Sequence, residues 1–575
     1  MAGVAQPYAR MFVPRLYTVL RAGYGWKDLR SDAMAALTVA VVALPLSMAL
    51  AIASGATPEK GLYTAIVAGL LISALGGSKV QIGGPTAAFI PVVFVVIQKF
   101  GFGGLILCTL LAGLMLIAAG LMRLGTLMKY MPQPVITGFT AGIAVSIFSS
   151  QVKDVLGLHM GQVPADFFAR WEAFAKYLPT AQAPAIGITL LGLGIIVGLR
   201  RWRPGWPGFL IALLVCTTLC VGMHLPAETV GSRFGDLPAS LPIFDFPHIP
   251  FERTRELFPS AFTIAFLAAV ESLLSAVVAD GMTGERHSSN GELVAQGVAN
   301  IASALFGGLP ATGAIARTAT NIRAGGHTPV AGVLHAVFIL LFMLMLAPLM
   351  RYIPLAALGA VLLIVAWNMS EVENFRHTMS APRGDRVVLL LTFGLTVFFD
   401  LTVAIEVGLV VSSFVFMFRM AETFEVSASP DGAGSKSVDG DGAVAGAGQG
   451  QRSHLPRDVE VYQINGPLFF GAASRLDDLL DQFFRQPRVF ILRMRLVPLI
   501  DASGVHALRT LAERCERRGI VLIVSGLQPQ PRQVIEKMDL QARAGVLHFA
   551  ANYGEALTLA ESQVGETLID DIAGI

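Results

Sequence analysis

Long apolar runs separated by short polar stretches occupy the first 420 residues of the chain. A membrane-spanning helix needs about 20 predominantly apolar residues. Twelve runs approach or reach that length, at 33–53, 61–75, 103–122, 131–150, 185–200, 207–224, 259–280, 292–306, 327–348, 354–369, 385–400 and 402–420. Two shorter runs, 86–98 and 312–324, reach only part of the way across. The pattern therefore predicts fourteen transmembrane segments.

The two short runs occupy equivalent places in two halves of this pattern. Each follows a break rich in glycine and proline, and they begin at residues 86 and 312, which are 226 apart. The first long run and the run at 259–280 are separated by the same interval. We therefore predict two repeats of seven segments, about 31–225 and 257–425. An odd number of segments per repeat requires that the second repeat is inverted in the membrane.

The composition supports a polytopic α-helical membrane protein. Of the 575 residues 54% are hydrophobic and 14% charged, whereas an ordinary soluble protein has about 25% charged residues. The net charge of +2 gives no support for a nucleic-acid partner. Residues 1–30 contain several basic side chains, so the positive-inside rule predicts a cytoplasmic N-terminal segment. Fourteen segments, an even number, then return the C-terminus to the cytoplasm.

The pattern changes abruptly after residue 425. Residues 427–455 are rich in Gly, Ala, Ser and Asp and indicate a flexible linker. Strands and helices then alternate in residues 456–575, which predicts a small cytoplasmic α/β domain. Its expected elements are Val459–Ile464, an apolar stretch Pro467–Phe470, a helix Ser474–Phe484, a strand Val489–Leu496, a helix Ser503–Arg518 and a strand Ile520–Ser525.

A lone arginine lies in the second short segment. Arg317 follows the break Gly307–Pro310 and is surrounded by small, apolar and hydroxyl side chains. A charge within the membrane costs about 2.5–3.5 kcal/mol on insertion scales, so Arg317 is a candidate functional residue. In inverted repeats the two short helices begin near the midplane, and their positive N-terminal ends converge on a cavity suited to an anion. Alternatively, Arg317 extends to the interface or pairs permanently with a carboxylate.

Glu271 is the second charge of interest. The run Phe262–Asp280 has no other ionisable residue before its last, and Ser275 and Ala268 share the helical face of Glu271. A carboxylate in the membrane is a candidate carrier of a coupling proton, or else a static partner of Arg317. The polar residues between 280 and 300 have either a structural or a gating role.

Several classes of function lack support. The sequence contains no Walker loop, no dinucleotide fingerprint and no spacing typical of a metal site. We therefore expect no cofactor, no metal, no enzymatic activity and no ATP-driven transport.

Six stretches carry a resemblance to a known family. They are ALPLSMALAIASG (43–55), GGPTAAF (83–89), ESLLSAVVADGMTG (271–284), GELVAQG (291–297), AIARTATNIRAG (314–325) and VAWNMSE (365–371). Through them the chain resembles the sulfate permease (SulP) family of anion transporters over nearly its whole length. Within that family it most resembles the bacterial C4-dicarboxylic acid transporters.

The resemblance implies a core domain that moves against a gate domain in an elevator-like manner, usually in a homodimer. It places the anion between Thr86-Ala87 and Ala316-Arg317. The first span would flank the anion with Leu46, Ser47 and Leu50. Glu271, with Ser275, falls where relatives couple transport to a proton or another cation. The first span lacks an acidic residue that some relatives carry there, which leaves the coupling ion open.

The C-terminal module resembles a STAS domain. The loop Leu499–Gly504 matches the loop before a helix of that fold, and Ser503 matches the position that is phosphorylated in anti-sigma-factor antagonists. The simpler interpretation is that Asp501 or Ser503 caps the helix. The resemblance implies that a cytoplasmic regulator binds this module.

These observations lead to one principal hypothesis of function. The chain is expected to take up C4-dicarboxylates (succinate, fumarate, aspartate) with protons across a bacterial inner membrane. Sulfate or bicarbonate transport, an anion channel and a sensor that signals through the STAS module remain as alternatives.

Overall fold

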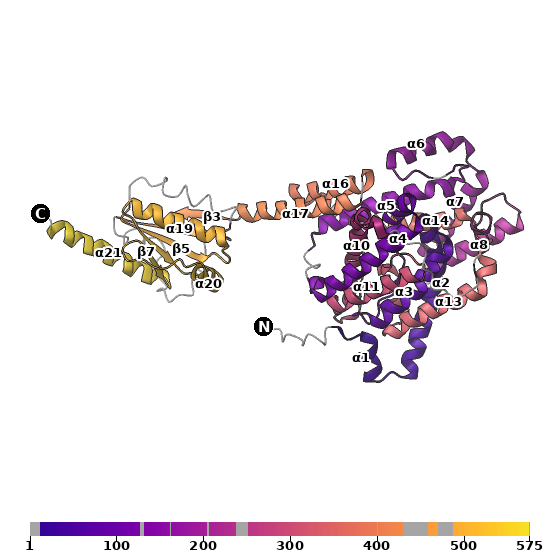
Figure 1. Cartoon of the computed structure of the whole chain (residues 1–575), viewed down its shortest axis with the longest axis horizontal. Helices are drawn as coiled ribbons and strands as arrows, with labels where there is room; N and C mark the ends of the chain where they lie inside the picture. The colour runs from indigo at the N-terminus through magenta and orange to yellow at the C-terminus, as the bar shows by residue number, and fades with distance from the viewer. Residues whose placement is uncertain are drawn as a thin grey trace. The chain divides into compact units, whose positions relative to one another are not determined.

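The computed structural model describes residues 12–126, 131–161, 163–203, 206–236, 238, 251–399, 401–428, 458–469 and 487–573. The chain divides into two compact units, Met1–Ser412 and Ser413–Ile575 (Figure 1). The expected linker lies mainly outside the described residues, as does the expected helix Ser474–Phe484.

The first unit is almost entirely helical. Its first half contains α1 (Arg15–Ala22), α2 (Trp26–Ala53), α3 (Pro58–Leu75), α4 (Ile90–Leu121), α5 (Gln133–Leu156), α6 (Phe167–Tyr177), α7 (Ala183–Trp202), α8 (Gly208–Gly222) and α9 (Val230–Phe234). Its second half contains α10 (Thr254–Thr283), α11 (Ser289–Leu305), α12 (Ile315–Arg323), α13 (Pro329–Met350), α14 (Leu355–Met369), α15 (Val372–Met379), α16 (Arg383–Phe398) and α17 (Leu401–Glu422). Short 3-10 turns are η2 (Ala87–Phe89), η3 (Leu124–Thr126), η5 (Leu178–Thr180) and η6 (Phe251–Arg253).

All fourteen predicted segments contain helix. In the described part of the chain, eight helical stretches are long and apolar enough to cross a membrane, and the other segments are shorter or less apolar. The predicted separation of 86–98 from 103–122 is a sharp kink at Gly101 within α4, where φ is 69°. Glycine adopts this conformation without steric cost. The helices α1, α6, α9 and α15 were not predicted.

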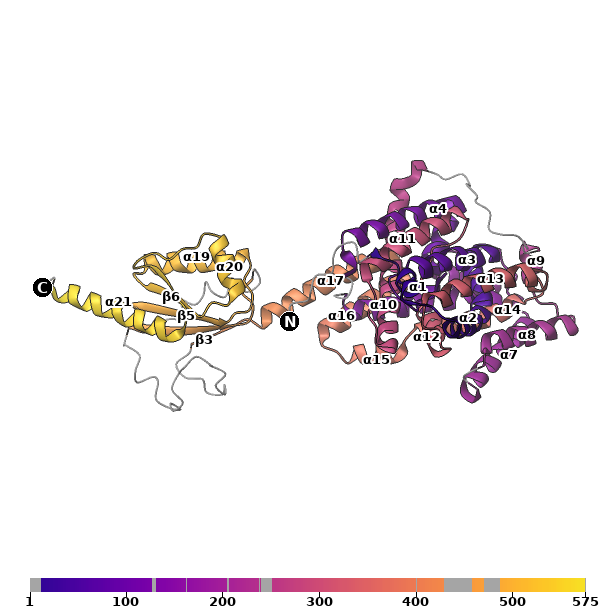
Figure 2. The same ribbon diagram turned by 90° about the horizontal axis from the view of Figure 1, so that it is seen from below.

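The two halves of this unit are interleaved. Helix α3 packs on α13 of the second half, and its counterpart α11 packs on α4 of the first half. In the same way α2 packs on α13 while α10 packs on α4. Figures 1 and 2 show this mixing of indigo and purple helices with magenta and orange ones. The arrangement agrees with the predicted inverted repeats.

Two very short strands lie at equivalent places within the two repeats. Strand β1 (Gly83–Gly84) pairs antiparallel with β2 (Thr312–Gly313), with Gly83 opposite Gly313. Strands β1 and β2 begin 229 residues apart and helices α3 and α11 begin 231 apart, close to the interval of 226 found in the sequence. The two Gly/Pro-rich breaks in the helical pattern, which were predicted to converge, are therefore hydrogen-bonded to each other.

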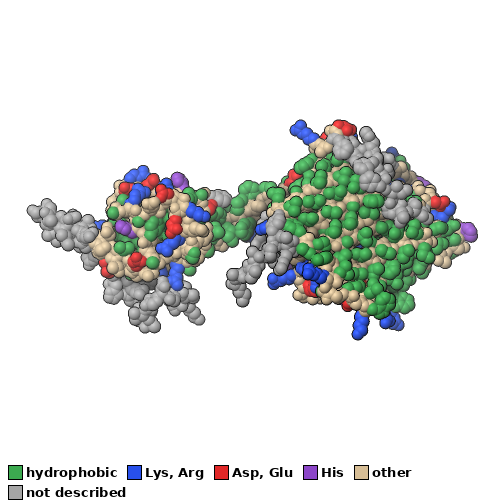
Figure 3. Space-filling model, turned by 60° about the horizontal axis from the view of Figure 1, so that its bottom comes forward, with side chains coloured by type: hydrophobic (Ala, Val, Ile, Leu, Met, Phe, Trp, Pro, Cys, Tyr) green, Lys and Arg blue, Asp and Glu red, His purple; other side chains and the backbone are tan. Residues whose placement is uncertain are grey.

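Small residues permit close packing inside the unit. A Cβ added to Gly297 of α11 would lie 2.5 Å from the Gly113 carbonyl oxygen of α4, and Gly113 faces Gly297 in the same way. Outside this core, large apolar side chains remain exposed. Figure 3 shows them as a broad apolar band with charged side chains at its edges, as expected for a surface in contact with lipid.

The second unit is an α/β domain with a five-stranded sheet in the order β3-β4-β5-β6-β7. Its elements are β3 (Glu425–Ala428), β4 (Val459–Asn465), β5 (Val489–Leu496), α19 (Ala502–Arg517), β6 (Val521–Ser525), α20 (Pro529–Lys537), β7 (Leu547–Ala550) and α21 (Tyr553–Ala573). Only the first pairing, β3 with β4, is antiparallel. The predicted strands and the α19 helix are confirmed to within a residue, whereas β3 was not predicted.

Alternation along β5 builds the two faces of the sheet. Phe490 and Leu492 belong to one apolar cluster, which includes residues of α19 and α20. Ile491 belongs to another, which includes Ala556 and Ala560 of α21. Successive side chains of a strand point to opposite faces, so the sheet is covered on both sides.

The contact between α4 and α11 is testable. We expect Gly297→Val to destabilise the first unit by about 1–3 kcal/mol, because its side chain overlaps the backbone of α4. Thermal unfolding of the purified protein in detergent, followed by size-exclusion chromatography, measures the effect. Gly194→Val on α7 is the matched control, because nothing lies within 4 Å of a Cβ added there. Equal stability of the two variants would contradict the close contact.

Candidate functional site

The candidate site is built around the paired strands β1 and β2. Side chains complete the hydrogen bonding of the irregular backbone on both sides of the pair. Asn300 of α11 clamps Ala311, donating to its carbonyl oxygen (2.8 Å) and accepting from its N–H (2.8 Å). Thr318 of α12 accepts from the Ile82 N–H at 3.1 Å, and Asn321 donates to the Val80 carbonyl oxygen at 2.9 Å. Irregular backbone at this depth is tolerated because protein groups satisfy it.

Helix α10 supports the pair from one side. The Ser272 hydroxyl lies 2.5 Å from the Thr312 hydroxyl and accepts from the Gly313 N–H at 3.2 Å. Thr312 in turn donates to the Ala268 carbonyl oxygen at 3.1 Å. Gln81 donates to the Ser272 carbonyl oxygen at 3.2 Å. These contacts fix β1 and β2 against the helix that carries Glu271.

Arg317 lies where α12, α2 and the end of β1 meet. Its Nη2 donates to the Pro85 carbonyl oxygen at 3.1 Å and to the Ser47 hydroxyl at 3.3 Å. The residue is only 4% exposed, and its Nη1 is buried without a hydrogen-bond partner. Among the described residues no carboxylate lies within 4.0 Å of the guanidinium, so the proposed permanent ion pair is not seen. The Nη1 group of the charged guanidinium therefore has no hydrogen-bond acceptor among the described residues.

The backbone of Gly84 makes room for this guanidinium. A Cβ at Gly84 would lie 2.4 Å from Arg317 Nη1, and the φ of Gly84 is 150°. A side chain at this position would therefore displace the charge from the end of β1.

Glu271 contacts the residue that follows Pro85 in the same chain segment. The Thr86 hydroxyl donates to Glu271 Oε2 at 2.8 Å. Thr86 directly follows Pro85, whose carbonyl oxygen binds Arg317. Two adjacent residues, Pro85 and Thr86, therefore connect the permanent cation with the carboxylate.

The helix that begins beside the strands adds positive partial charge. Helix α12 starts at Ile315, so the N–H groups of its first turn have no acceptor within the helix. On the other repeat, η2 and then α4 follow Thr86. Both starts lie directly after β1 and β2, as the sequence predicted, and positive helix ends favour an anion.

The other expected site residues differ in accessibility. Ala316 is exposed and Leu46 is partly exposed, whereas Leu50 and Ala87 are buried. The Ser275 hydroxyl donates to the Thr318 hydroxyl at 3.3 Å. This hydrogen bond places Ser275 beside Thr318 of α12, and it does not involve Glu271. Sequence analysis missed Gln81, Ser272 and Thr312; the only signal was their small or polar character inside apolar segments.

The polar stretch between 280 and 300 has structural contacts. Buried Glu292 accepts from the Gly77 N–H at 2.8 Å and from the Ser78 N–H at 3.2 Å. Arg15 of α1 donates to the carbonyl oxygens of Gly77 (3.2 Å) and Arg286 (2.8 Å). These bonds tie the chain after α3 to the chain before α11.

A second set of contacts joins the start of α2 to the loop after α12. Buried Asp32 accepts from the hydroxyl and N–H of Thr328 and from the N–H of His327. The Tyr24 hydroxyl donates to Asp32 at 3.0 Å, and His327 Nε2 lies 3.1 Å from Asp28. We call these residues the α2–α13 clamp. It joins α2, which supplies Ser47, to the loop that connects α13 with α12, the helix that supplies Arg317.

In the second unit, Asp501 caps α19. Its Oδ1 accepts from the Gly504 N–H at 2.8 Å, which decides between the two capping residues left open by the sequence. Ser503 is partly exposed on the first turn of the helix.

Comparisons with known proteins agree with this architecture. The model of the sulfate permease family matches residues 29–392, and the STAS domain model matches residues 454–556. The "Putative sulfate transporter YvdB" of Bacillus subtilis is 41% identical over 93% of this chain and 98% of its own length. The transmembrane domain of a cyanobacterial bicarbonate transporter, BicA, is 29% identical and covers 66% of this chain and 98% of its own, with a TM-score of 0.62. The murine anion transporter Slc26a9 covers 98% of this chain and 96% of its own at 19% identity, with a TM-score of 0.83, which indicates a shared fold.

The α2–α13 clamp predicts a dependence of stability on pH. Burial lowers the pKa of His327, but its bond to the Gly325 carbonyl and the Asp28 and Asp32 carboxylates outweigh burial and raise the pKa. Its stabilising contribution is therefore complete below the unfolded value of about 6.5 and is lost as pH rises through the folded pKa.

We expect that wild-type protein loses on the order of 1 °C in melting temperature over this range. His327→Gln should remove this change, while His377→Gln on the exposed face of α15 should retain it. Thermal unfolding at a series of pH values measures it. A pH profile of His327→Gln identical to wild type would contradict the role of the clamp.

Proposed function

Because the chain belongs to the sulfate permease family of anion transporters, we propose that it moves a small oxyanion together with a proton by secondary active transport. One observation carries the proposal: a buried arginine with a free Nη1 donor lies beside two converging strands and a helix start. A buried charged donor without a partner is unfavourable by about 1–3 kcal/mol, and an oxyanion would satisfy it.

The charges of the site favour a compact anion. Arg317 is the cation that touches Pro85 and Ser47, and Glu271 of α10 contacts Thr86, the residue that follows Pro85. An extended dicarboxylate would place its second carboxylate without a matching cation near Glu271. We therefore favour a single-centre oxyanion of the sulfate or bicarbonate class, and relatives named for those two anions support it. A C4-dicarboxylate is the second candidate and rests on the resemblance of the six motifs.

Thr86 offers a route for proton coupling. With Glu271 ionised, the Thr86 hydroxyl donates its only hydrogen to the carboxylate. A protonated Glu271 would donate to the Thr86 oxygen instead, and the Thr86 hydrogen would be free for the anion. Binding of the proton and binding of the anion would then favour each other, as symport requires.

Helix packing supports the elevator-like movement of one group of helices. Helices α2–α4 and α10–α13 pack among themselves around the site, while α5 packs mainly on α14 and α16, and α7 on α8 and α14. The first group would move as the core against the second as the gate. The protein would lie in a bacterial inner membrane, with the α1 end of α2 and the STAS domain on the cytoplasmic side. It would assemble as a homodimer. A regulator at Ser503 remains a prediction.

Uptake into proteoliposomes tests the function. We expect sulfate or bicarbonate to compete best for uptake, with succinate and fumarate weaker, and uptake to be faster on the acidic side of neutrality.

Arg317→Ala should lower uptake at least tenfold, because a charge-assisted hydrogen bond contributes about 1.5–3 kcal/mol. Arg323→Ala, an exposed arginine on the same helix, is the control and should transport normally. Wild-type anion affinity in Arg317→Ala would refute the site, and absence of flux under any gradient would favour a sensor.

Glu271→Gln tests the coupling separately. A glutamine keeps the size of the side chain and its contact with Thr86 but does not exchange a proton. We expect anion binding within about threefold of wild type and uptake that no longer rises as pH falls. Glu406→Gln, an exposed carboxylate of α17, should leave the pH profile of uptake unchanged. A wild-type pH profile in Glu271→Gln would show that another group carries the proton.

A further inference from the structure

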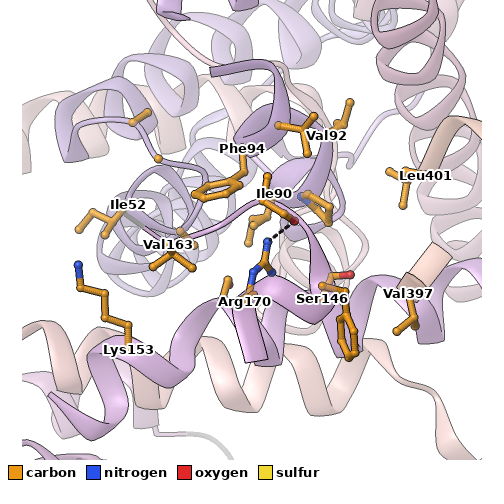
Figure 4. A pocket seen from close by; sticks show the side chains of 18 of the residues that line it. Ile52, Ile90, Val92, Phe94, Ser146, Lys153, Val163, Arg170, Val397 and Leu401 are labelled. Carbon is orange, nitrogen blue, oxygen red and sulfur yellow. Dashed lines mark hydrogen bonds between the residues drawn. The ribbon is translucent and has the colours of Figure 1, made fainter. Parts of the chain in front are cut away.

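A cavity of about 320 Å³ lies near the end of α2 that is remote from α1. Its walls come from the α2 end, the first part of α4, the C-terminal part of α5, α6 and the region where α16 meets α17. Ile90 and Pro91 at the start of α4 line it, only three residues beyond Ala87 of the candidate site. Figure 4 shows the apolar side chains of Ile52, Val92 and Phe94 in its walls.

Three cations and one carboxylate line this cavity, namely Lys153, Arg170, Arg233 and Asp154. Arg233 lies between two carboxylates, whose excess negative charge partly balances the nearby Lys153. The Nη2 of Arg233 lies 2.8 Å from Asp154 and 2.6 Å from Glu228, and its Nε donates to Glu228 as well. Asp154, the only carboxylate among the described residues that line the cavity, is therefore committed to this ion pair.

Lys153 and Arg170 contact neutral backbone oxygens instead. Lys153 Nζ donates to the Gly161 carbonyl oxygen at 3.0 Å. Arg170 donates from Nε to Pro164 (3.0 Å) and from Nη2 to Ala165 (2.9 Å). Within the described ranges no carboxylate oxygen lies within 4.0 Å of either cation. In Figure 4 both side chains rise from the same side of the cavity toward Ile52, Ile90 and Phe94.

Burial makes the absence of a direct ion pair at these two described cations significant. Arg170 is 8% exposed and its guanidinium lies 5.6 Å from the centre of the Phe94 ring. Asp166 begins the same helix, accepts from the Ala169 N–H at 3.0 Å and balances part of the Arg170 charge without direct contact. A buried cation is costly unless an opposite charge is near, and apolar walls reduce screening by water. The cavity therefore attracts a small anion.

We propose that Lys153 and Arg170 form a second anion site, at which the transported oxyanion binds before it reaches Arg317. The site rests on the proposed function for the identity of its ligand. It would raise the local anion concentration at the mouth of the transport path, because charged clefts with apolar walls accelerate association. The cavity reaches the first turn of α4, and η2 joins that turn to Thr86.

Transport kinetics with sulfate as the probe test the second site. We expect Lys153→Gln to raise the KM for uptake about three- to tenfold at unchanged kcat, and to weaken the dependence of KM on ionic strength. Lys176→Gln removes the same charge from an exposed position of α6 and should leave KM unchanged. If Lys153→Gln and Lys176→Gln have the same KM and the same salt dependence, the proposal is wrong.

Binding in a variant without the transport site distinguishes the two proposals. Arg317→Ala should lose uptake yet retain weak binding of radiolabelled sulfate, which Lys153→Gln and Arg170→Lys should each reduce further. Thermal unfolding of each variant identifies loss of fold, because Arg170 holds the chain at Pro164 and Ala165. Absence of residual binding in folded Arg317→Ala would overturn the second site and leave the proposed function intact. Normal uptake by Arg317→Ala would instead overturn the proposed function.

Discussion

The pairing of β1 with β2 is the constraint on which the rest of the first unit depends. Two breaks inside an apolar helical unit expose backbone groups that water does not reach, and each unsatisfied group costs several kcal/mol in such surroundings. The two breaks satisfy each other in part, and Asn300, Thr318 and Asn321 satisfy neighbouring groups. Thr318 and Asn321 belong to the second repeat but bond to Ile82 and Val80 of the first, so the breaks hold only when the repeats are interleaved.

The same constraint positions the charges. The Arg317 side chain extends from α12 to the end of β1. Gly84 has no side chain there, which leaves room for the guanidinium. Pro85 and Ser47 take up only Nη2, so the fold leaves Nη1 as a free donor. The next residue, Thr86, contacts Glu271 of α10. A cation and a carboxylate that belong to the second repeat are thus connected through one segment of the first.

Sequence reasoning predicted the elements better than the contacts. Apolar runs and Gly/Pro breaks set the fourteen segments and their repeat, because length and periodicity are local properties. The prediction that two helix starts converge near Arg317 followed from the inversion of the second repeat. Inversion is a global property, and the constant interval between the repeats indicated it. Local pattern did not reveal that Ser275 bonds to Thr318, that Asn300 clamps Ala311, or that β3 joins the sheet of the second unit. Those outcomes depend on which distant segments pack together, and a single sequence contains no direct record of that.

The two anion sites differ in a way that suits transport in series. Arg317 is almost fully buried and lies beside a helix start, so its interaction with an anion is weakly screened. Lys153 is only partly buried and lies in a cavity that contains an already formed ion pair. Its attraction is therefore weaker and more sensitive to salt. A weak outer site gathers anions without retaining them, and a stronger inner site holds one while the core moves. Reversing that order would slow entry, because an anion held tightly at the cavity would have to escape before it could reach Arg317.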